Sequence, residues 1–230
     1  MTAQNRIFLQ SDSLPIDIIT DRKAISRRPV FYRNYAKRMI DVFLVLLSAP
    51  IVVPAIVIMA ALVACDGRST FYRQERVGKG GRIFTMWKLR TMVCDADAKL
   101  AQYLENNPAA RKEWDEKQKL TNDPRITRLG RVMRKCSMDE LPQLWNVLIG
   151  DMSLIGPRPM LPEQRMMYPG RAYYKLRPGI SGFWQVSDRN DSSFAARAGH
   201  DNRYDKEISL MTDLRVLALT VLVVLRGTGC

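Results

Sequence analysis

The chain has 230 residues, a formal net charge of +13 at pH 7, one histidine and four cysteines. The cysteines are scattered without Cys-x-x-Cys spacing, which argues against a zinc site and against a disulfide framework. The excess of lysine and arginine calls for an anionic partner, and nucleic acid, anionic lipid and phosphorylated substrates all qualify. The length favours one domain with room for an appendage.

The N-terminal part of the chain divides into a polar and an apolar segment. Residues 1–30 are polar and show no sustained hydrophobic period, so we expect a disordered tail there. A signal peptide is not predicted, because the first apolar run begins too late and lacks a cleavage pattern. Residues 39–64 form the one membrane candidate, and a straight helix of that length would reach about 39 Å, enough to cross a hydrocarbon core of about 30 Å.

Two features of this apolar segment favour a re-entrant helix-break-helix over a crossing helix. Pro50 and Pro54 fall near its middle, and lysines and arginines flank both ends, which the positive-inside rule would keep in the cytoplasm. Broken at the prolines, each arm would be roughly 16–21 Å long, about half the depth of a bilayer. A spanning helix with a proline kink is the alternative. Arg38 and Asp41, three residues apart, are placed to pair on one helix face.

Residues 70–92 read as two short strands around a turn at 78–81, where three glycines are available. Aromatic and branched residues interleave with arginines and lysines along both strands. This pattern is typical of a half-buried hairpin whose basic face is exposed to solvent. The alternative is that the basic face binds the diphosphate of a substrate.

The next segment connects this hairpin to a pair of acids. Residues 95–120 are charged and favour helix, with a break near Asn106-Asn107-Pro108, so we expect two solvated surface helices without chemistry. The amphipathic stretch 129–135 then leads to Ser137.

Asp139 and Glu140 follow Ser137 and precede Pro142. Ser-x-x-Glu is a capping-box pattern, which predicts acids at the N-terminal end of a short helix continuing through the apolar run 144–149. Pro142 conflicts with a start at Ser137, whereas a start nearer Asp139 removes the conflict. Acids in a first helical turn are usually caps. The alternative is an ionised carboxylate acting as nucleophile, with its neighbour holding a divalent cation.

Several blocks together resemble the signature of the bacterial sugar transferases, which are membrane-associated phosphoglycosyl transferases. The matching blocks are DELPQLWNV at 139–147, GDMSL at 150–154, GPRP at 156–159, KRMID at 37–41, YRQERVG at 72–78, KLRTM at 88–92 and RPGISGFWQVSDR at 177–189. In the last block Asp188 stands where the family usually has glycine. The resemblance covers about residues 31–230.

The resemblance implies transfer of a sugar 1-phosphate from a UDP-sugar to polyprenyl phosphate, with release of UMP. It makes Asp139 the nucleophile that carries a covalent phospho-sugar intermediate, and Glu140 the ligand of Mg²⁺. It implies substrate-binding cations at Arg38, Arg76, Lys88, Arg90, Arg158 and Arg189. Two alternatives are a non-catalytic, membrane-anchored basic binding module and a phosphohydrolase that uses Asp139.

The expected organisation is a mainly helical α+β fold with a short β-hairpin. We expect a tail over 1–30, a re-entrant membrane helix over 31–65 and a catalytic domain over 66–230 on the cytoplasmic face of a bacterial inner membrane. The apolar run 216–225 is too short to span a bilayer, so it is core or an interfacial helix, and we favour the latter. Membrane lipid is an expected partner and nucleic acid is not. The identity of the sugar and a homo-oligomer are left open.

Overall fold

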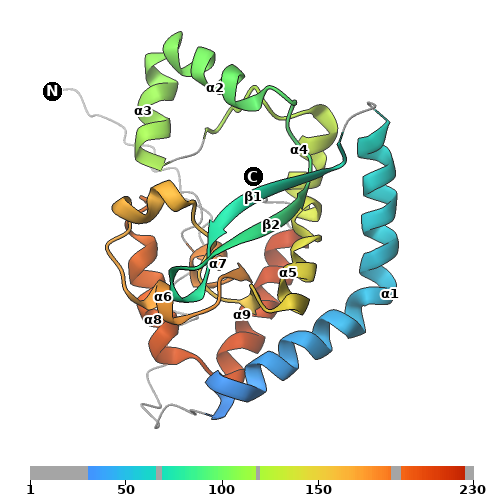
Figure 1. Cartoon of the computed structure of the whole chain (residues 1–230), viewed down its shortest axis with the longest axis vertical. Coiled ribbons are helices and arrows are strands. Elements are labelled where there is room, and N and C mark those ends of the chain that lie inside the picture. The colour runs from blue at the N-terminus through green and yellow to red at the C-terminus, as the bar shows by residue number, and fades with distance from the viewer. Residues whose placement is uncertain (1–30, 66–68, 118–119, 188–192, 226–230) are drawn as a thin grey trace, which may run out of the picture.

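The computed structural model describes residues 31–65, 69–117, 120–187 and 193–225. The expected tail over 1–30, and Asp188 and Arg189, lie outside the described residues. The described chain is mainly helical, with one antiparallel and one parallel two-stranded sheet (Figure 1). The predicted mainly helical α+β class with a β-hairpin is therefore confirmed.

The elements follow one another along the chain as short 3₁₀ or π segments (η), helices and strands. Their order is η2 (Tyr32–Ala36), α1 (Lys37–Ala64), β1 (Phe71–Val77), η3 (Lys79–Gly81), β2 (Ile83–Leu89), α2 (Ala96–Glu105), α3 (Pro108–Lys117), α4 (Arg128–Lys135), η4 (Met138–Glu140), α5 (Gln143–Ile149), β3 (Ser153–Ile155), η5 (Pro162–Met167), α6 (Ala172–Lys175), β4 (Gly179–Ser181), α7 (Phe183–Val186), α8 (Arg197–Glu207) and α9 (Leu210–Leu225).

The apolar helix α1 bends along the outside of the molecule (Figure 1). Pro50 and Pro54 lie inside it, and each removes a backbone hydrogen bond, which accounts for the bend. The expected break into two arms is therefore a bend within one helix. By length and composition, Tyr32–Ala64 could cross a membrane, and almost none of its most apolar stretch is buried against the rest of the chain.

Polar contacts fix the N-terminal half of α1 to the domain. Asp41 is buried and accepts hydrogen bonds from Ser153 Oγ at 2.6 Å and from the Leu154 backbone N–H at 3.3 Å. Arg38 donates instead to two carbonyl groups in the last turn of α5. The expected pairing of Arg38 with Asp41 is wrong, because each side chain finds a partner on a different neighbouring element.

The C-terminal end of α1 rests on the same domain. Val63 packs in a buried cluster with Leu89 of β2 and Met133 of α4. Arg90, just after β2, donates from Nη2 to the Val63 carbonyl oxygen at 3.2 Å. Both ends of α1 are thus attached to one body, while the middle of the helix points outward.

The hairpin and the helix pair agree with the sequence-based expectation. Strands β1 and β2 pair from Phe71↔Leu89 to Val77↔Ile83, and the turn uses Gly80 and Gly81 at positive φ. Helices α2 and α3 flank the expected break, and α4 covers the predicted amphipathic stretch.

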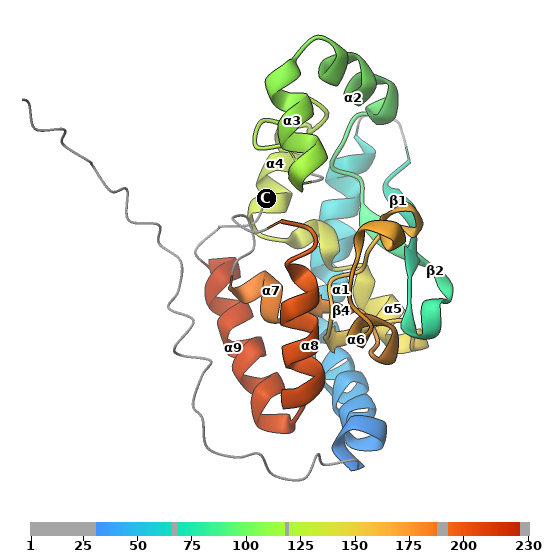
Figure 2. The ribbon, with the colours of Figure 1, turned by 90° about the vertical axis from the view of Figure 1, so that its left-hand side faces the viewer.

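Helix α9 has one buried and one exposed side. Val216 is buried in a cluster shared with α7, α8 and β3. Figure 2 shows α7, α8 and α9 lying side by side. Met211 and Val221 are 68% and 58% exposed. The apolar run is therefore partly core, and its outer side is suited to an interface with lipid.

Candidate active site

The acid pair lies in a tight turn rather than in a regular helix. Asp139 and Glu140 belong to the 3₁₀ segment η4, and α5 begins only at Gln143. Ser137 makes no side-chain capping bond and has a left-handed backbone with φ +53°. The predicted capping box is therefore wrong. A left-handed conformation is unusual for serine and turns the chain sharply out of α4, which aims both acids at the hairpin.

Asn146 joins α5, the helix that follows the acid pair, to β2 through two hydrogen bonds. Its side chain is fully buried, accepts from the Trp87 backbone N–H at 3.1 Å and donates to the Thr85 carbonyl oxygen at 2.7 Å. The amide thus bridges two ladder positions of β2, which fixes Lys88 on the same strand relative to Glu140.

Glu140 is held between two cations. Lys88 Nζ lies 2.7 Å from Glu140 Oε1, and Arg158 Nη2 lies 3.7 Å from the same oxygen. The Lys88 and Glu140 side chains are each 18% exposed, so this pair is screened less than a surface salt bridge. The hairpin, η4 and the loop after β3 therefore meet at one carboxylate.

Asp139 is buried, at 6% exposure. Burial raises the pKa of this carboxyl above its ordinary value, and Glu140 acts in the same direction, while the cations Lys88 and Arg134 oppose the rise. Arg134 is itself fixed by donation from Nε to Thr91 Oγ1 at 2.9 Å. The expected ionised state of Asp139 therefore depends on Lys88 and Arg134, because their positive charges lower its pKa.

A cluster of three guanidinium groups, which we call the arginine cluster, lies beside the acid pair. It consists of Arg76 on β1, Arg158 after β3 and Arg197 on α8. Burial and the neighbouring guanidinium of Arg158 lower the pKa of Arg76 to about 10 and that of Arg197 to about 9. Three mutually repelling cations, compensated only in part by the carboxylates of Glu140 and Asp201, favour an anionic ligand between them.

The contacts of the arginine cluster leave donors available. Arg197 stacks on the Trp184 ring at 4.1 Å from its centroid, and Arg158 lies 5.8 Å from the same centroid. Arg76 donates from Nη1 to the Pro159 carbonyl oxygen at 3.1 Å. The Nε atoms of Arg76 and Arg197 are buried without a hydrogen-bond partner among the described residues. Buried unsatisfied donors are costly, so a bound anion would satisfy them.

The loop that carries Arg158 is positioned by close backbone packing of two motif blocks. Ser153 and Ile155 of β3 pair in parallel with Gly179 and Ser181 of β4. A Cβ atom on Gly156 would lie 2.3 Å from the Arg177 carbonyl oxygen, so only glycine permits this approach. The GPRP and RPG motifs thus pack against each other through their backbones, and this contact positions Arg158.

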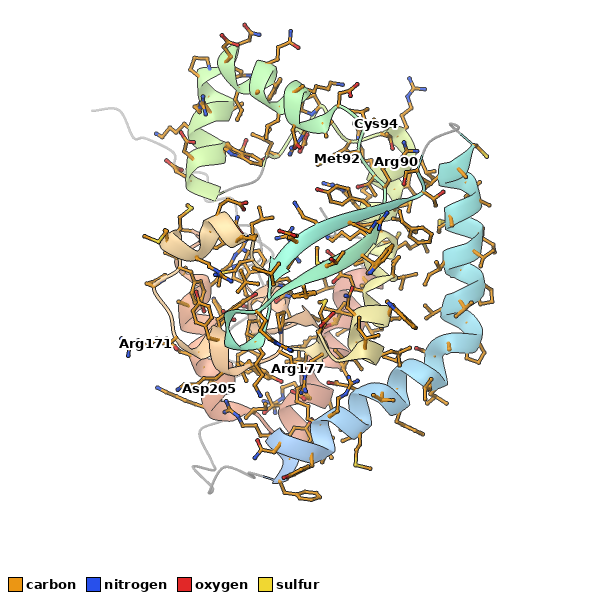
Figure 3. The ribbon with its side chains drawn as sticks, in the orientation of Figure 1. Arg90, Met92, Cys94, Arg171, Arg177 and Asp205 are labelled. Carbon is orange, nitrogen blue, oxygen red and sulfur yellow. The ribbon has the colours of Figure 1, made fainter. Side chains whose placement is uncertain are left out.

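The structure gathers some of the predicted substrate-binding residues and separates others. Lys88, Arg76 and Arg158 lie around the acid pair. Arg38 contacts the end of α5, and Arg90 contacts the end of α1 and Cys94 Sγ (Figure 3). Arg189 lies outside the described residues.

Two cations at this site were not predicted as site residues. Arg134 lies in the predicted amphipathic stretch and ends a run, 123–134, that is similar to one in the bacterial sugar transferases, but we assigned it no role. Arg197 carried no motif signal. The helical period of 128–135 predicts that α4 has one polar face, but it does not predict which element that face contacts. Arg197 joins the arginine cluster because α8 packs on α7, where Arg197 contacts Trp184.

The acid pair fits a magnesium ion in its donor chemistry. Mg²⁺ prefers oxygen ligands and commonly takes one or two carboxylates together with substrate phosphates and water. Asp139 and Glu140 supply such oxygens next to cations that suit a diphosphate. No group of three His, Cys, Asp or Glu side chains able to hold a metal occurs in the described part of the chain, so substrate and water would complete the coordination.

Comparison with known proteins gives one family match and several relatives. A family profile described as "Bacterial sugar transferase" matches residues 32–227. The chain is 45% identical over 198 residues to a "UDP-galactose-lipid carrier transferase" of Erwinia amylovora, and 42% identical over 198 residues to an "Undecaprenyl-phosphate galactose phosphotransferase" of Salmonella typhimurium. Each alignment covers 85% of this chain but 42% of the relative, so the chain spans less than half of those two proteins. It is also 39% identical to the "Exopolysaccharide production protein ExoY" of Rhizobium meliloti, over 96% of this chain and 97% of that one.

Proposed function

The chain belongs to the bacterial sugar transferase family, and from this premise we propose that it transfers a sugar 1-phosphate from a UDP-sugar to polyprenyl phosphate, releasing UMP and starting an exopolysaccharide. The observation that carries the proposal is a buried carboxylate, Asp139, with Lys88 and Arg134 close to it and the arginine cluster beside its neighbour Glu140. Relatives whose names include a UDP-galactose-lipid carrier transferase and an undecaprenyl-phosphate phosphotransferase support the substrate classes.

In the first step Asp139 acts as nucleophile. A carboxylate oxygen of Asp139 attacks the phosphorus that bears the sugar, and the bond from that phosphorus to the bridging oxygen breaks. UMP leaves with the electron pair, and the sugar phosphate becomes an acyl phosphate on Asp139. Lys88 and Arg134 favour this step because they stabilise the ionised carboxylate.

In the second step an oxygen of polyprenyl phosphate attacks the same phosphorus. The bond to the Asp139 oxygen breaks, which releases polyprenyl-diphospho-sugar and restores the carboxylate. A two-step route suits a soluble donor and a lipid acceptor, because the two substrates need not occupy the site together. Exposed Met138, which precedes the acid pair, and exposed Trp145, five residues after Glu140, offer an apolar approach for the lipid.

The cations stabilise the charge of the diphosphate. Arg158 lies near Glu140 as well as near Arg76 and Arg197, so it is placed to contact the phosphate that is transferred or the one that leaves. Mg²⁺, held by Glu140, would supply further positive charge against the diphosphate. Arg76 and Arg197 would donate through their buried Nε atoms, which have no hydrogen-bond partner within the described part of the chain.

We further propose that α1 is re-entrant, with residues 66–230 as the catalytic domain on the cytoplasmic face. A straight helix of its 28 residues would be about 42 Å long and would carry its ends to opposite sides of a bilayer. Instead Asp41 near one end and Val63 near the other contact the same domain. A bend that keeps both ends on one side accommodates these contacts.

Labelling with a membrane-impermeant maleimide tests the topology. Tyr35→Cys and Ser69→Cys, each in a background without the native cysteines, place one thiol before and one after the apolar segment. Both should react in inside-out vesicles and neither in intact spheroplasts. Reaction of the two sites from opposite faces would mean a spanning helix.

The function is tested by nucleotide release from the purified chain in lipid with Mg²⁺ and a panel of UDP-sugars. UMP should appear for a matching sugar, and sustained turnover should require polyprenyl phosphate. Asp139→Asn should abolish turnover while leaving the protein in the membrane fraction. Release of UDP would indicate glycosyl transfer instead, and free sugar phosphate without a lipid product would indicate a phosphohydrolase.

A further inference from the structure

A cationic cavity lies at the tip of the hairpin, apart from the arginine cluster. It has a volume of about 300 Å³ and is open to solvent on one side. Its charged and apolar lining comprises Lys79, Arg82, Ile83, Phe84, Asp151 and Arg177. Three cations face a single carboxylate, so the cavity carries an excess of positive charge.

This cavity is separate from the acid pair. It adjoins Ile83 at the start of β2, whereas Lys88, which contacts Glu140, is five residues further along the strand. At about 3.3 Å per residue this separation is about 16 Å. A ligand in the cavity therefore cannot touch Asp139 at the same time, unless it is much longer than a phosphate group.

Hydrogen bonds fix two parts of the cavity wall. Arg177 donates from Nε to the Gly150 carbonyl oxygen at 3.0 Å, which ties β4 to the turn after α5. Arg165 donates to the Gly81 carbonyl oxygen and holds the hairpin turn. The fixed position of Arg177 and of the hairpin turn reduces the entropy lost when a ligand binds.

The cations of the cavity repel one another. Burial lowers the pKa of Lys79, and the nearby guanidiniums of Arg177 and Arg33 lower it further. The pKa of Arg177 is lowered by burial and by Arg38. An anion at this position would relieve the repulsion without any rearrangement of the backbone.

The surroundings of the cavity favour a lipid as the source of the anion. Arg33 and Arg38, whose charges reach the cavity, lie at the N-terminal end of the apolar helix. There Phe31 and Tyr35 are 71% and 64% exposed, with ring centroids 6.1 Å apart. Ile83 in the cavity wall is also 45% exposed. Exposed aromatic and basic residues together are typical of the headgroup region of a membrane.

We propose that the cavity formed by Lys79, Arg82 and Arg177 binds the phosphodiester headgroup of an anionic membrane phospholipid, at a site distinct from the acid pair. The proposal rests on the membrane association of α1 that is part of the proposed function. The bound headgroup holds the hairpin tip against the membrane surface, and this orients the other end of the hairpin, with Lys88, toward the lipid acceptor.

The test uses the full chain, delipidated in a neutral detergent, and dihexanoyl-phosphatidylglycerol as the probe. Binding is followed by the rise in unfolding temperature with lipid concentration. Dihexanoyl-phosphatidylcholine, inorganic phosphate and UMP are the comparison ligands. No donor sugar is added, so failure of the proposed transfer reaction would not affect this measurement.

The decisive variant is Lys79→Gln/Arg82→Gln, because both residues are exposed and support no buried contact of the described fold. Its control is Arg111→Gln/Lys112→Gln, which removes the same charge from exposed positions on α3. We expect the phosphatidylglycerol dissociation constant to rise about 30-fold in the first variant and less than about two-fold in the control. Asp151→Asn removes the carboxylate of the cavity and should tighten binding about five-fold.

Several results would overturn the proposal. Equal weakening in the two double variants would mean that lipid binds through overall charge. Unchanged affinity in Lys79→Gln/Arg82→Gln would place the lipid elsewhere. Binding of inorganic phosphate or UMP as tight as that of phosphatidylglycerol would make the cavity a site for soluble phosphates, and equal binding of phosphatidylcholine would remove any role for the cations.

Discussion

Lys88 on β2 and Glu140 in η4, 52 residues apart in sequence, form an ion pair with 2.7 Å between Nζ and Oε1. This contact joins the basic hairpin to the acid pair. The same lysine lowers the pKa of Asp139 against the effect of burial, so one side chain serves both carboxylates.

Replacement of Lys88 by methionine should change the pH dependence of turnover. Without this cation the pKa of Asp139 rises, so a smaller fraction of the carboxylate is ionised at a given pH. The acid limb of the kcat/KM profile therefore moves to higher pH, by about one unit. At neutral pH we expect kcat/KM to fall about 100-fold. Lys88→Arg keeps the charge and should keep the limb in place. An unmoved limb in Lys88→Met would show that Lys88 does not control Asp139.

Replacement of Arg197 by glutamine should weaken donor binding more than chemistry. The variant loses one charged donor of the arginine cluster, so KM for the UDP-sugar should rise about 50-fold while kcat changes less than about three-fold. The fold loses the stack on Trp184 but also one member of a repelling cluster, so its free energy of unfolding should change little. Arg111→Gln on α3 is the control for net charge. A fall in kcat at constant KM would contradict a binding role.

Replacement of Asn146 by alanine should destabilise the domain by about 3 kcal/mol. Two buried hydrogen bonds to β2 are lost, and the Trp87 N–H and Thr85 carbonyl are left without their partner. Denaturant unfolding in detergent measures the loss. Asn146→Asp keeps the acceptor for Trp87 but loses the donor to Thr85, so it separates the two bonds. Wild-type stability in Asn146→Ala would mean that this bridge does not hold α5.

Asp201 should make stability depend on pH between about 4 and 6. Burial raises its pKa to about 6 from an ordinary 3.8, although Tyr168 donates to it at 2.6 Å. The folded state therefore binds the proton more tightly than the unfolded state, and this contribution to stability is lost as the pH rises through that window. Relative to wild type, Asp201→Asn should gain up to about 3 kcal/mol between pH 4 and pH 7. A constant difference across this range would contradict the raised pKa.

The local elements of the fold follow from the sequence to a large extent. The glycines at 78–81 predicted the hairpin, and Asn106-Asn107-Pro108 predicted the break between α2 and α3. The capping box failed, because Ser137 adopts a left-handed backbone and the chain forms a 3₁₀ turn before α5. Here the contact of Glu140 with Lys88 and the burial of Asp139 outweigh a local capping preference.

The family, the acid pair and a long apolar helix could be predicted from the residues alone, because motif spacing and hydrophobic runs are local properties of the chain. The folded structure was needed to show that Arg197 joins Arg76 and Arg158, and that both ends of α1 rest on one domain. Those arrangements depend on how distant elements pack, and no periodicity within one segment specifies the partner that its exposed face will meet.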